Sequence, residues 1–277
     1  MLGFSLSLPA TKVALAGLDP WFIAFGRSVG AGALAAAYLL LIRARKPDVA
    51  QVRRLVVVAL GVVVGFPLCT SIGLTMQSSA HGAVIIAVLP AATAVLAVLR
   101  AGEHPSRRFW LASAAGLVAV LTFVVVAGAV QGGVGIADAF FLAAVGLCAL
   151  GYAEGGALAR DLGGAQTICW ALVVALPVTA PVTAISAGTA ARDADQVTTT
   201  AWLGFAYVTA VSMFLGFIAW YAGLARGGVA RVSQVQLAQP VLTIAWSALL
   251  LREPVGGLAI VAALAVVACV FATQRSR

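Results

Sequence analysis

The sequence predicts an all-α membrane protein with ten transmembrane helices, arranged as two inverted repeats of five helices. Of its 277 residues, 62% are hydrophobic and only 9% are charged, and the mean hydropathy is +1.07. The apolar residues form ten long runs, and a pattern of scarce residues recurs after 150 positions. Soluble domains carry about a quarter of charged residues, so the expected solvent of this chain is a bilayer.

The ten runs define the expected spans. A helix needs about 20 mainly apolar residues to cross the hydrocarbon core. Runs of this kind lie at 2–18, 21–42, 55–75, 79–99, 109–130, 137–158, 167–188, 201–224, 232–251 and 255–273. Helices are expected because unpaired backbone groups are costly in lipid. The first run contains Pro9 and Lys12 and is barely long enough. It is either a short, tilted helix or a helix whose upstream residues are missing from this chain.

Basic residues predict the orientation. If both termini are cytoplasmic, thirteen of the 17 Lys and Arg residues fall inside and only Arg192 and Arg252 fall outside. Lys and Arg concentrate in the cytoplasmic loops of membrane proteins. We therefore expect a multi-pass protein of the inner (plasma) membrane with both termini in the cytoplasm. The same bias accounts for the net charge of +8, so nucleic acid is not an expected partner.

An internal repeat appears when the chain is shifted by 150 residues. Pro90 then falls on Pro240 and Glu103 on Glu253, in a chain with only ten prolines and nine acidic residues. The expected halves are 1–133 and 134–277, with five spans each. Because five is odd, the second half is inverted relative to the first, which is common in secondary transporters. Their substrate sites lie between the halves near the midplane, and they work by alternating access.

Three stretches carry a family resemblance. WYAGLARGGVARVSQVQLAQPVLTIAWSALLLRE (220–253) and its counterpart IGLTMQSSAHGAVIIAVLPAATAVLAVLRAGE (72–103) resemble the end of an EamA repeat of the drug/metabolite transporter superfamily. GFSLSLPATKVALAGLDPWFIAFGR (3–27) resembles the family's opening helix, its lysine and the following Pro and Arg. The resemblance covers nearly the whole chain, and it departs at the short first helix and at Gly102 before Glu103. It implies a ten-helix basket that moves small metabolites and often exports amino acids.

Three charged residues fall inside the expected spans, where a charge normally faces protein or a water-filled cavity. Lys12 could attract a carboxylate, or reach its interface instead. Glu154 could bind an ammonium group or a proton, or pair with the nearby Arg160. Arg27 lies near a helix end, so we expect it to reach the interface or to pair with a neighbour.

The ninth run carries a polar face. Pro240 lacks an N–H and frees the carbonyl of Gln236, which on a cavity wall could bind an ammonium or hydroxyl group. The alternative is a kink packed against a neighbouring helix, its carbonyl satisfied by Ser or Thr. Thr243 and Gln239 lie on or near the same face. Pro90 and Pro240 are the expected hinges.

Other residues complete the expected substrate site. His81 could titrate between pH 5 and 8, or be an ordinary interfacial histidine. Tyr152 and Trp220 could stack on a substrate, or pack between helices. Glycine pairs four residues apart (61/65, 151/155 and 223/227) are expected to let helices approach closely. The full predicted set is Lys12, Thr11, His81, Tyr152, Glu154, Trp220, Gln236, Gln239 and Thr243.

The sequence contains no catalytic, nucleotide-binding or metal-binding motif, so we expect no cofactor and no enzyme activity. Transport must then run on a gradient, either of the substrate itself or of protons. We predict a secondary transporter that exports small metabolites, with aromatic or neutral amino acids as the leading substrates and the lipid bilayer as its surroundings. The alternatives are a drug or other metabolite exporter of the same fold, a non-transporting membrane enzyme and an assembly factor.

Overall fold

The computed structural model describes residues 1–77, 79–126, 135–190 and 197–239, together with 241–242, 246, 264–265 and 268–269. Regular structure in these residues is helical throughout. Five segments are long and apolar enough to cross a membrane, namely Pro20–Leu41, Val49–Met76, Ile136–Leu162, Gly164–Gly188 and Thr199–Gly227. Each coincides with an expected run, which confirms an all-helical protein with several membrane spans. Most of the last two expected runs lies outside the described residues.

The first half contains a series of helical segments. They are α1 (Leu2–Ser5), α2 (Ser7–Ala14), α3 (Pro20–Leu41), α4 (Val49–Val58), η1 (Ala59–Gly65), α5 (Phe66–Met76), α6 (Ser79–Ile86), α7 (Leu89–Ala101) and α8 (Arg107–Val126). Asp19 caps α3 by accepting hydrogen bonds from the N–H groups of Trp21 and Phe22. The segment α4–η1–α5 is continuous, with the π-helix η1 at its middle.

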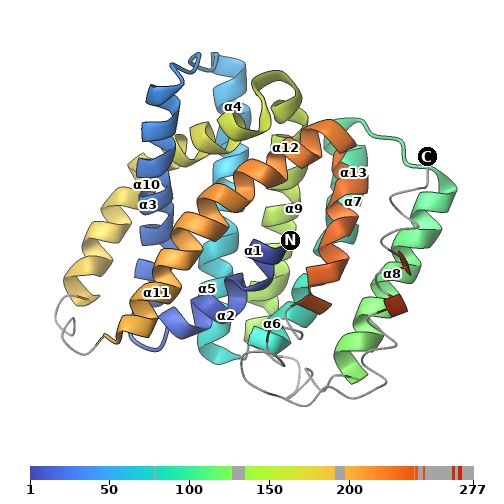
Figure 1. Ribbon diagram of the computed structural model, residues 1–277, viewed down its shortest axis with the longest axis horizontal. Helices are drawn as coiled ribbons and strands as arrows, with labels where there is room; N and C mark the ends of the chain where they lie inside the picture. Colours follow the sequence, from blue (N-terminus) through green and yellow to red (C-terminus); the bar gives the residue numbers. More distant parts are fainter. Residues whose placement is uncertain are drawn as a thin grey trace.

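The second half contains one segment whose bounds match those of α4–η1–α5 after a shift of 150 residues. The helices of this half are α9 (Ile136–Leu162), α10 (Gly164–Ala190), α11 (Thr199–Tyr207), the π-helix η3 (Val208–Gly216), α12 (Phe217–Gly227), α13 (Val229–Ser233) and the 3-10 helix η4 (Gln234–Ala238). A shift of 150 residues moves the segment 49–76 to 199–226, and the structure has a helical segment at 199–227. The same shift moves η1 to 209–215, which lies inside η3. Figure 1 shows α4–α5 and α11–α12 running in opposite directions.

Prolines divide two of the expected spans. The first run is not one helix over 2–18 but two short ones, α1 and α2, because the nitrogen of Pro9 has no hydrogen to donate to the carbonyl of Ser5. The run 79–99 is likewise split by a turn at Ala87–Val88, and Pro90 lies in the first turn of α7. Pro67, in contrast, lies within a continuous helical segment. Because proline has no N–H, Pro67 leaves the Val63 carbonyl free, and this carbonyl accepts a 2.8 Å hydrogen bond from Ser28 Oγ.

Glycines bring the helices of the two halves into close contact. A Cβ at Gly61 in η1 would collide with the Leu147 carbonyl and lie 3.1 Å from the Cα of Gly151 in α9. The Gly151 carbonyl accepts a 3.0 Å hydrogen bond from the buried Tyr221 hydroxyl. A Cβ at Gly155 would collide with the Tyr221 ring. The predicted role of these glycine pairs in close helix packing is therefore confirmed for 61 and 151/155.

The basic residues gather at one end of the bundle. The connections α3–α4, α7–α8, α9–α10 and α12–α13 all lie at this end, which is uppermost in Figure 1. We call it the basic end, and it is defined by Arg43, Arg45, Lys46, Arg53, Arg54, Arg100, Arg107, Arg108, Arg160, Arg226 and Arg231. The opposite end, which holds the α2–α3 and α5–α6 connections, is called the far end.

Candidate functional site

The site is built around the break between α6 and α7. The carbonyl of Pro90, in the first turn of α7, faces side chains of α13 and η4. It accepts hydrogen bonds from Gln234 Nε2 at 3.1 Å and from Ser233 Oγ at 3.4 Å. Gln234 is fully buried, and its Oε1 accepts a 2.9 Å hydrogen bond from Ser113 Oγ of α8. Gln234 therefore ties the predicted hinge at Pro90 to the second half.

A small cavity lies at this break. Its walls are Leu8, Ala83, Ile86, Ala87, Leu89, Gln236 and Gln239. Two predicted site residues, Gln236 and Gln239, supply its polar groups. Within the described part of the chain, the Oε1 atom of the buried Gln236 has no hydrogen-bond partner. The volume of about 20 Å³ suits one water molecule rather than a metabolite. The helices that line this cavity therefore pack too closely to hold a metabolite there.

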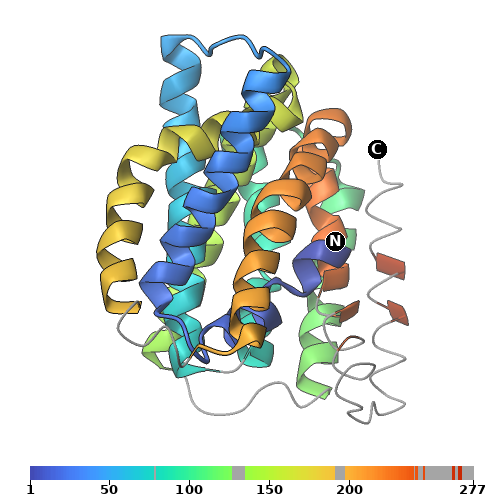
Figure 2. The ribbon, with the colours of Figure 1, turned by 60° about the vertical axis from the view of Figure 1, so that its left-hand side comes forward.

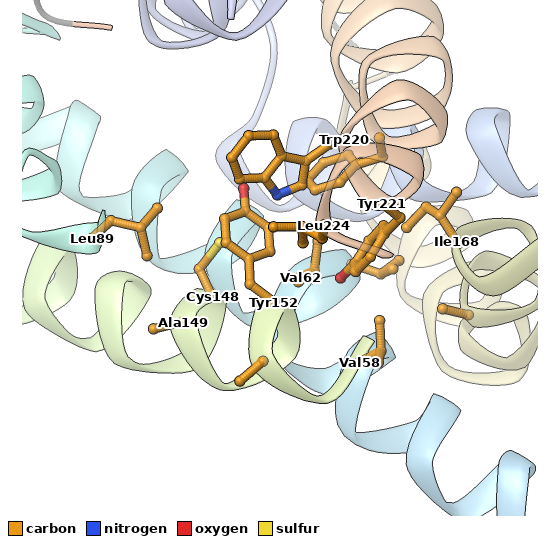
Figure 3. Close-up of a cluster of buried hydrophobic side chains, with 14 of the residues drawn as sticks. Val58, Val62, Leu89, Cys148, Ala149, Tyr152, Ile168, Trp220, Tyr221 and Leu224 are labelled. Carbon is orange, nitrogen blue, oxygen red and sulfur yellow. The ribbon is translucent and has the colours of Figure 1, made fainter. Parts of the chain in front are cut away.

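An aromatic cluster adjoins the cavity. Figure 3 shows Tyr152 of α9 pointing toward Trp220 of α12, and their ring centroids are 5.4 Å apart. The Tyr152 hydroxyl accepts a 3.4 Å hydrogen bond from Gln236 Nε2. The structure therefore brings together three predicted site residues, Tyr152, Trp220 and Gln236, from three helical segments. All three are at least nine-tenths buried, and the indole N–H of Trp220 has no hydrogen-bond partner among the residues that the structure describes.

A second, larger cavity of about 590 Å³ has Trp220 in its wall. Its walls are Met1, Leu2, Gly3, Phe4, Leu215, Gly216, Ala219, Trp220, Gly223, Val232 and Val235. Phe4 stands beside Trp220, with ring centroids 6.2 Å apart, and its carbonyl accepts a 3.2 Å hydrogen bond from Gln239 Nε2. The cavity is large enough for a small metabolite, and its side chains are apolar.

Glu154 lies in an ion cluster at the basic end. Its carboxylate is 2.5 Å from Arg54 Nε and 3.4 Å from Arg100 Nε. The side chain of Glu154 is 8% exposed, while those of the two arginines are 34% and 48% exposed. The ionic partners of Glu154 are therefore Arg54 and Arg100, and Arg160 pairs with another residue. Both pairs join the expected half 134–277 to the half 1–133.

Glu103 makes a second connection between the halves at the basic end. It follows α7, whose C-cap Gly102 adopts a left-handed conformation with φ of 63°. The carboxylate accepts hydrogen bonds from the backbone N–H groups of Val229 at 2.7 Å and Ala230 at 2.8 Å, at the start of α13. Arg160 Nη2 lies 2.6 Å from the same carboxylate. Glu103 thus caps a helix of the other half.

The far end carries its own contacts. His81 Nε2 lies 2.7 Å from Asp138 Oδ1, and both residues are buried. The other Asp138 oxygen accepts a hydrogen bond from the N–H of Gly135. Lys12 donates hydrogen bonds to the carbonyls of Leu74 at 2.6 Å and Gln77 at 3.1 Å, at the C-terminus of α5. Its ammonium group therefore satisfies carbonyls that the helix end leaves open.

The remaining predicted residues are not part of the cluster or are not described. Thr11 donates a 2.8 Å hydrogen bond to the Ser7 carbonyl within α2. Thr243 and the second predicted hinge, Pro240, lie outside the described residues. Asp138, Glu103 and Arg54 were not predicted as site residues. Their partners are distant in the sequence. The only sequence signal for Asp138 and Glu103 is that they are acidic residues near helix ends, and no such signal exists for Arg54.

Together, the helical spans, the helix broken at a buried proline and the contacts between two halves are typical of secondary transporters. The chain belongs to the EamA-like transporter family, whose model matches residues 1–125 and 135–274. It is 43% identical over 275 residues to the uncharacterized transporter YdeK of Bacillus subtilis (strain 168), across 99% of this chain and 94% of that protein. A crystal structure aligns with 98% of this chain and 94% of its own chain, with a TM-score of 0.73 and 16% identity, which shows a common fold.

Proposed function

We propose that this protein is a secondary transporter that exports small metabolites, with neutral or aromatic amino acids as its leading substrates. The observation that carries the proposal is the broken helix α6–α7, whose break meets Gln234, Gln236 and Gln239 of the second half. Broken helices at the junction of two repeats form the substrate sites of many transporters. Membership of a transporter family is consistent with a protein that is not an enzyme.

The proposed mechanism is alternating access between two inverted halves, 1–133 and 134–277. The offset of 150 residues between helix bounds and the opposite directions of α4–α5 and α11–α12 support this arrangement. Contacts between the halves occur at the basic end through Glu103 and Glu154, and at the far end through His81 and Asp138. Each set must break when its end opens, so we assign them as two gates.

The positive-inside bias supports the placement of the basic end in the cytoplasm of a bacterial-type inner membrane, with both termini inside. Transport would run on the substrate gradient or on a proton gradient. A second candidate, export of apolar drugs, is favoured by the apolar walls of the 590 Å³ cavity.

Counterflow in proteoliposomes tests the proposal. Purified protein is reconstituted, the vesicles are loaded with unlabelled solute, and uptake of radiolabelled solute is followed with and without a pH gradient. The panel contains leucine, phenylalanine, serine and two lipophilic cationic drugs. Amino-acid exchange above that of protein-free vesicles is expected. Exchange of the drugs alone would favour the second candidate, and no exchange of any solute would reject the transporter proposal.

A further inference from the structure

Arg27 of α3 is a buried cation without a protein partner. The residue is 4% exposed, and its Nε atom has no hydrogen-bond partner. Within the described residues no ion pair reaches it. The expectation that Arg27 reaches the interface or pairs with a neighbour is therefore wrong. A charge held in a low-dielectric interior without a partner is costly, so its retention needs an explanation.

The contacts of its neighbours show where the Arg27 side chain points. Ser28 faces η1, because its hydroxyl binds the Val63 carbonyl. Gly26 faces α11, where an added Cβ would lie 3.2 Å from the Phe205 ring. Successive residues of a helix are turned by about 100°, so Gly26 and Ser28 face nearly opposite sides of α3. Gly32 faces α10 on one side between them, where an added Cβ would lie 2.7 Å from Leu176 Cδ2, so Arg27 faces the other side. The helix α3 packs against α5 of the first half and η3 of the second, and Figure 2 shows it beside both segments.

Arg27 therefore projects toward the interface between the halves, where α2 also packs against α5, α11 and η3. Long side chains of a helix bend toward its N-terminus, which for α3 is the far end. The guanidinium group thus lies in the far-end part of this interface. This is the region through which a solute passes in a transporter with inverted repeats.

The charged groups around the bundle leave Arg27 available. The Lys12 ammonium group is occupied by two backbone carbonyls. The described carboxylates of Asp19, Asp48, Glu103, Asp138 and Glu154 all accept hydrogen bonds elsewhere, and Asp161 is exposed near the basic end. The sequence suggested that Lys12 could attract a carboxylate. Because the Lys12 ammonium group is occupied, Arg27 is the buried cation that can take this role.

We propose that Arg27 binds the carboxylate of the transported solute. This inference rests on the proposed function and narrows its substrate class to small carboxylates such as amino acids. A planar guanidinium group donates two parallel hydrogen bonds to a carboxylate, which lysine is unable to do. The same buried charge repels a cationic drug, such as the two lipophilic cations of the counterflow panel.

Competition in the counterflow assay tests the proposal. Uptake of radiolabelled leucine and phenylalanine is competed by the unlabelled acid, its methyl ester or its amide. In the wild type the acid should compete roughly 10- to 100-fold better than the ester, which corresponds to loss of a charge-assisted hydrogen-bond pair. Arg27→Gln should abolish this preference, Arg27→Lys should retain part of it, and Arg108→Gln, an exposed arginine of α8, should leave it unchanged.

The preference for acid over ester separates binding from folding, because a purely structural role would lower total uptake without changing this ratio. An unchanged ratio in Arg27→Gln would overturn the proposal while leaving the transporter function in place. If Arg27→Gln fails to fold, Arg27→Lys decides in the same way, since an unchanged ratio there would exclude paired hydrogen bonding. Wild-type protein that exchanges no solute would reject the transporter proposal, and this assignment with it.

Discussion

Removing the Glu103 carboxylate should loosen the start of α13. In Glu103→Ala the N–H groups of Val229 and Ala230 lose their acceptors, and Arg160 loses its partner. Loss of a helix N-cap costs about 0.5–2 kcal/mol. Because Arg160 is 42% exposed, its ion pair adds only about 0.2–1 kcal/mol. The total of about 1–3 kcal/mol corresponds to a roughly 5- to 150-fold increase in local opening.

Amide hydrogen exchange of the segment 228–238 measures this opening directly in detergent or nanodiscs. Glu103→Ala should speed exchange by the full factor. Glu103→Gln keeps one acceptor oxygen and should have a smaller effect, and Arg160→Gln should change exchange by no more than about fivefold. Glu154→Gln serves as the control because Glu154 does not contact α13 through any described hydrogen bond. A change below twofold in Glu103→Ala would refute the assigned capping role.

Two further substitutions test the packing and the ion cluster. Glu154→Gln should lower stability by about 1–2 kcal/mol and weaken transport, because Arg54 and Arg100 lose their shared carboxylate. Unchanged thermal unfolding and unchanged transport would remove Glu154 from the mechanism. Gly61→Ala should destabilise by about 1–3 kcal/mol in thermal unfolding, because its Cβ meets the backbone of α9. Gly146→Ala, where a Cβ meets nothing within 4 Å, is the matched control and should not destabilise, so equal losses in the two variants would contradict the close helix contact.

Local sequence patterns predicted much of the fold. Runs of apolar residues located the five described spans. The pair Gly61 and Gly65 located a close helix contact, because a glycine has no side chain wherever it stands in the fold. Pro90 marked a real helix break for a similar reason, since a proline has no N–H wherever it stands. The sequence did not reveal that Pro9 divides the first run into two short helices.

Partnerships between distant residues were beyond the reach of these patterns. His81 and Asp138 are separated by 57 positions, and Glu103 and Val229 by 126. Glu154 carried a nearby candidate in Arg160, but the geometry of the bundle gives it Arg54 and Arg100 instead. Arg27 was expected to reach the interface or to pair with a neighbour because it lies near a helix end. Tertiary packing instead covers that helix end and buries the side chain. Burial and pairing depend on which helices meet, and a single sequence does not specify this.

Distances across the two gates test the central claim, that the halves open one end at a time. Spin labels on cysteines replacing Arg107 and Asp161 report on the basic end, and labels at Thr75 and Ile136 report on the far end, all four sites being exposed. Pulsed electron paramagnetic resonance is then recorded in nanodiscs with and without Glu103→Ala. We predict that this substitution adds a longer distance at the basic end and no longer distance at the far end. Lengthening at both ends together, or at neither, would contradict alternating access between the two halves.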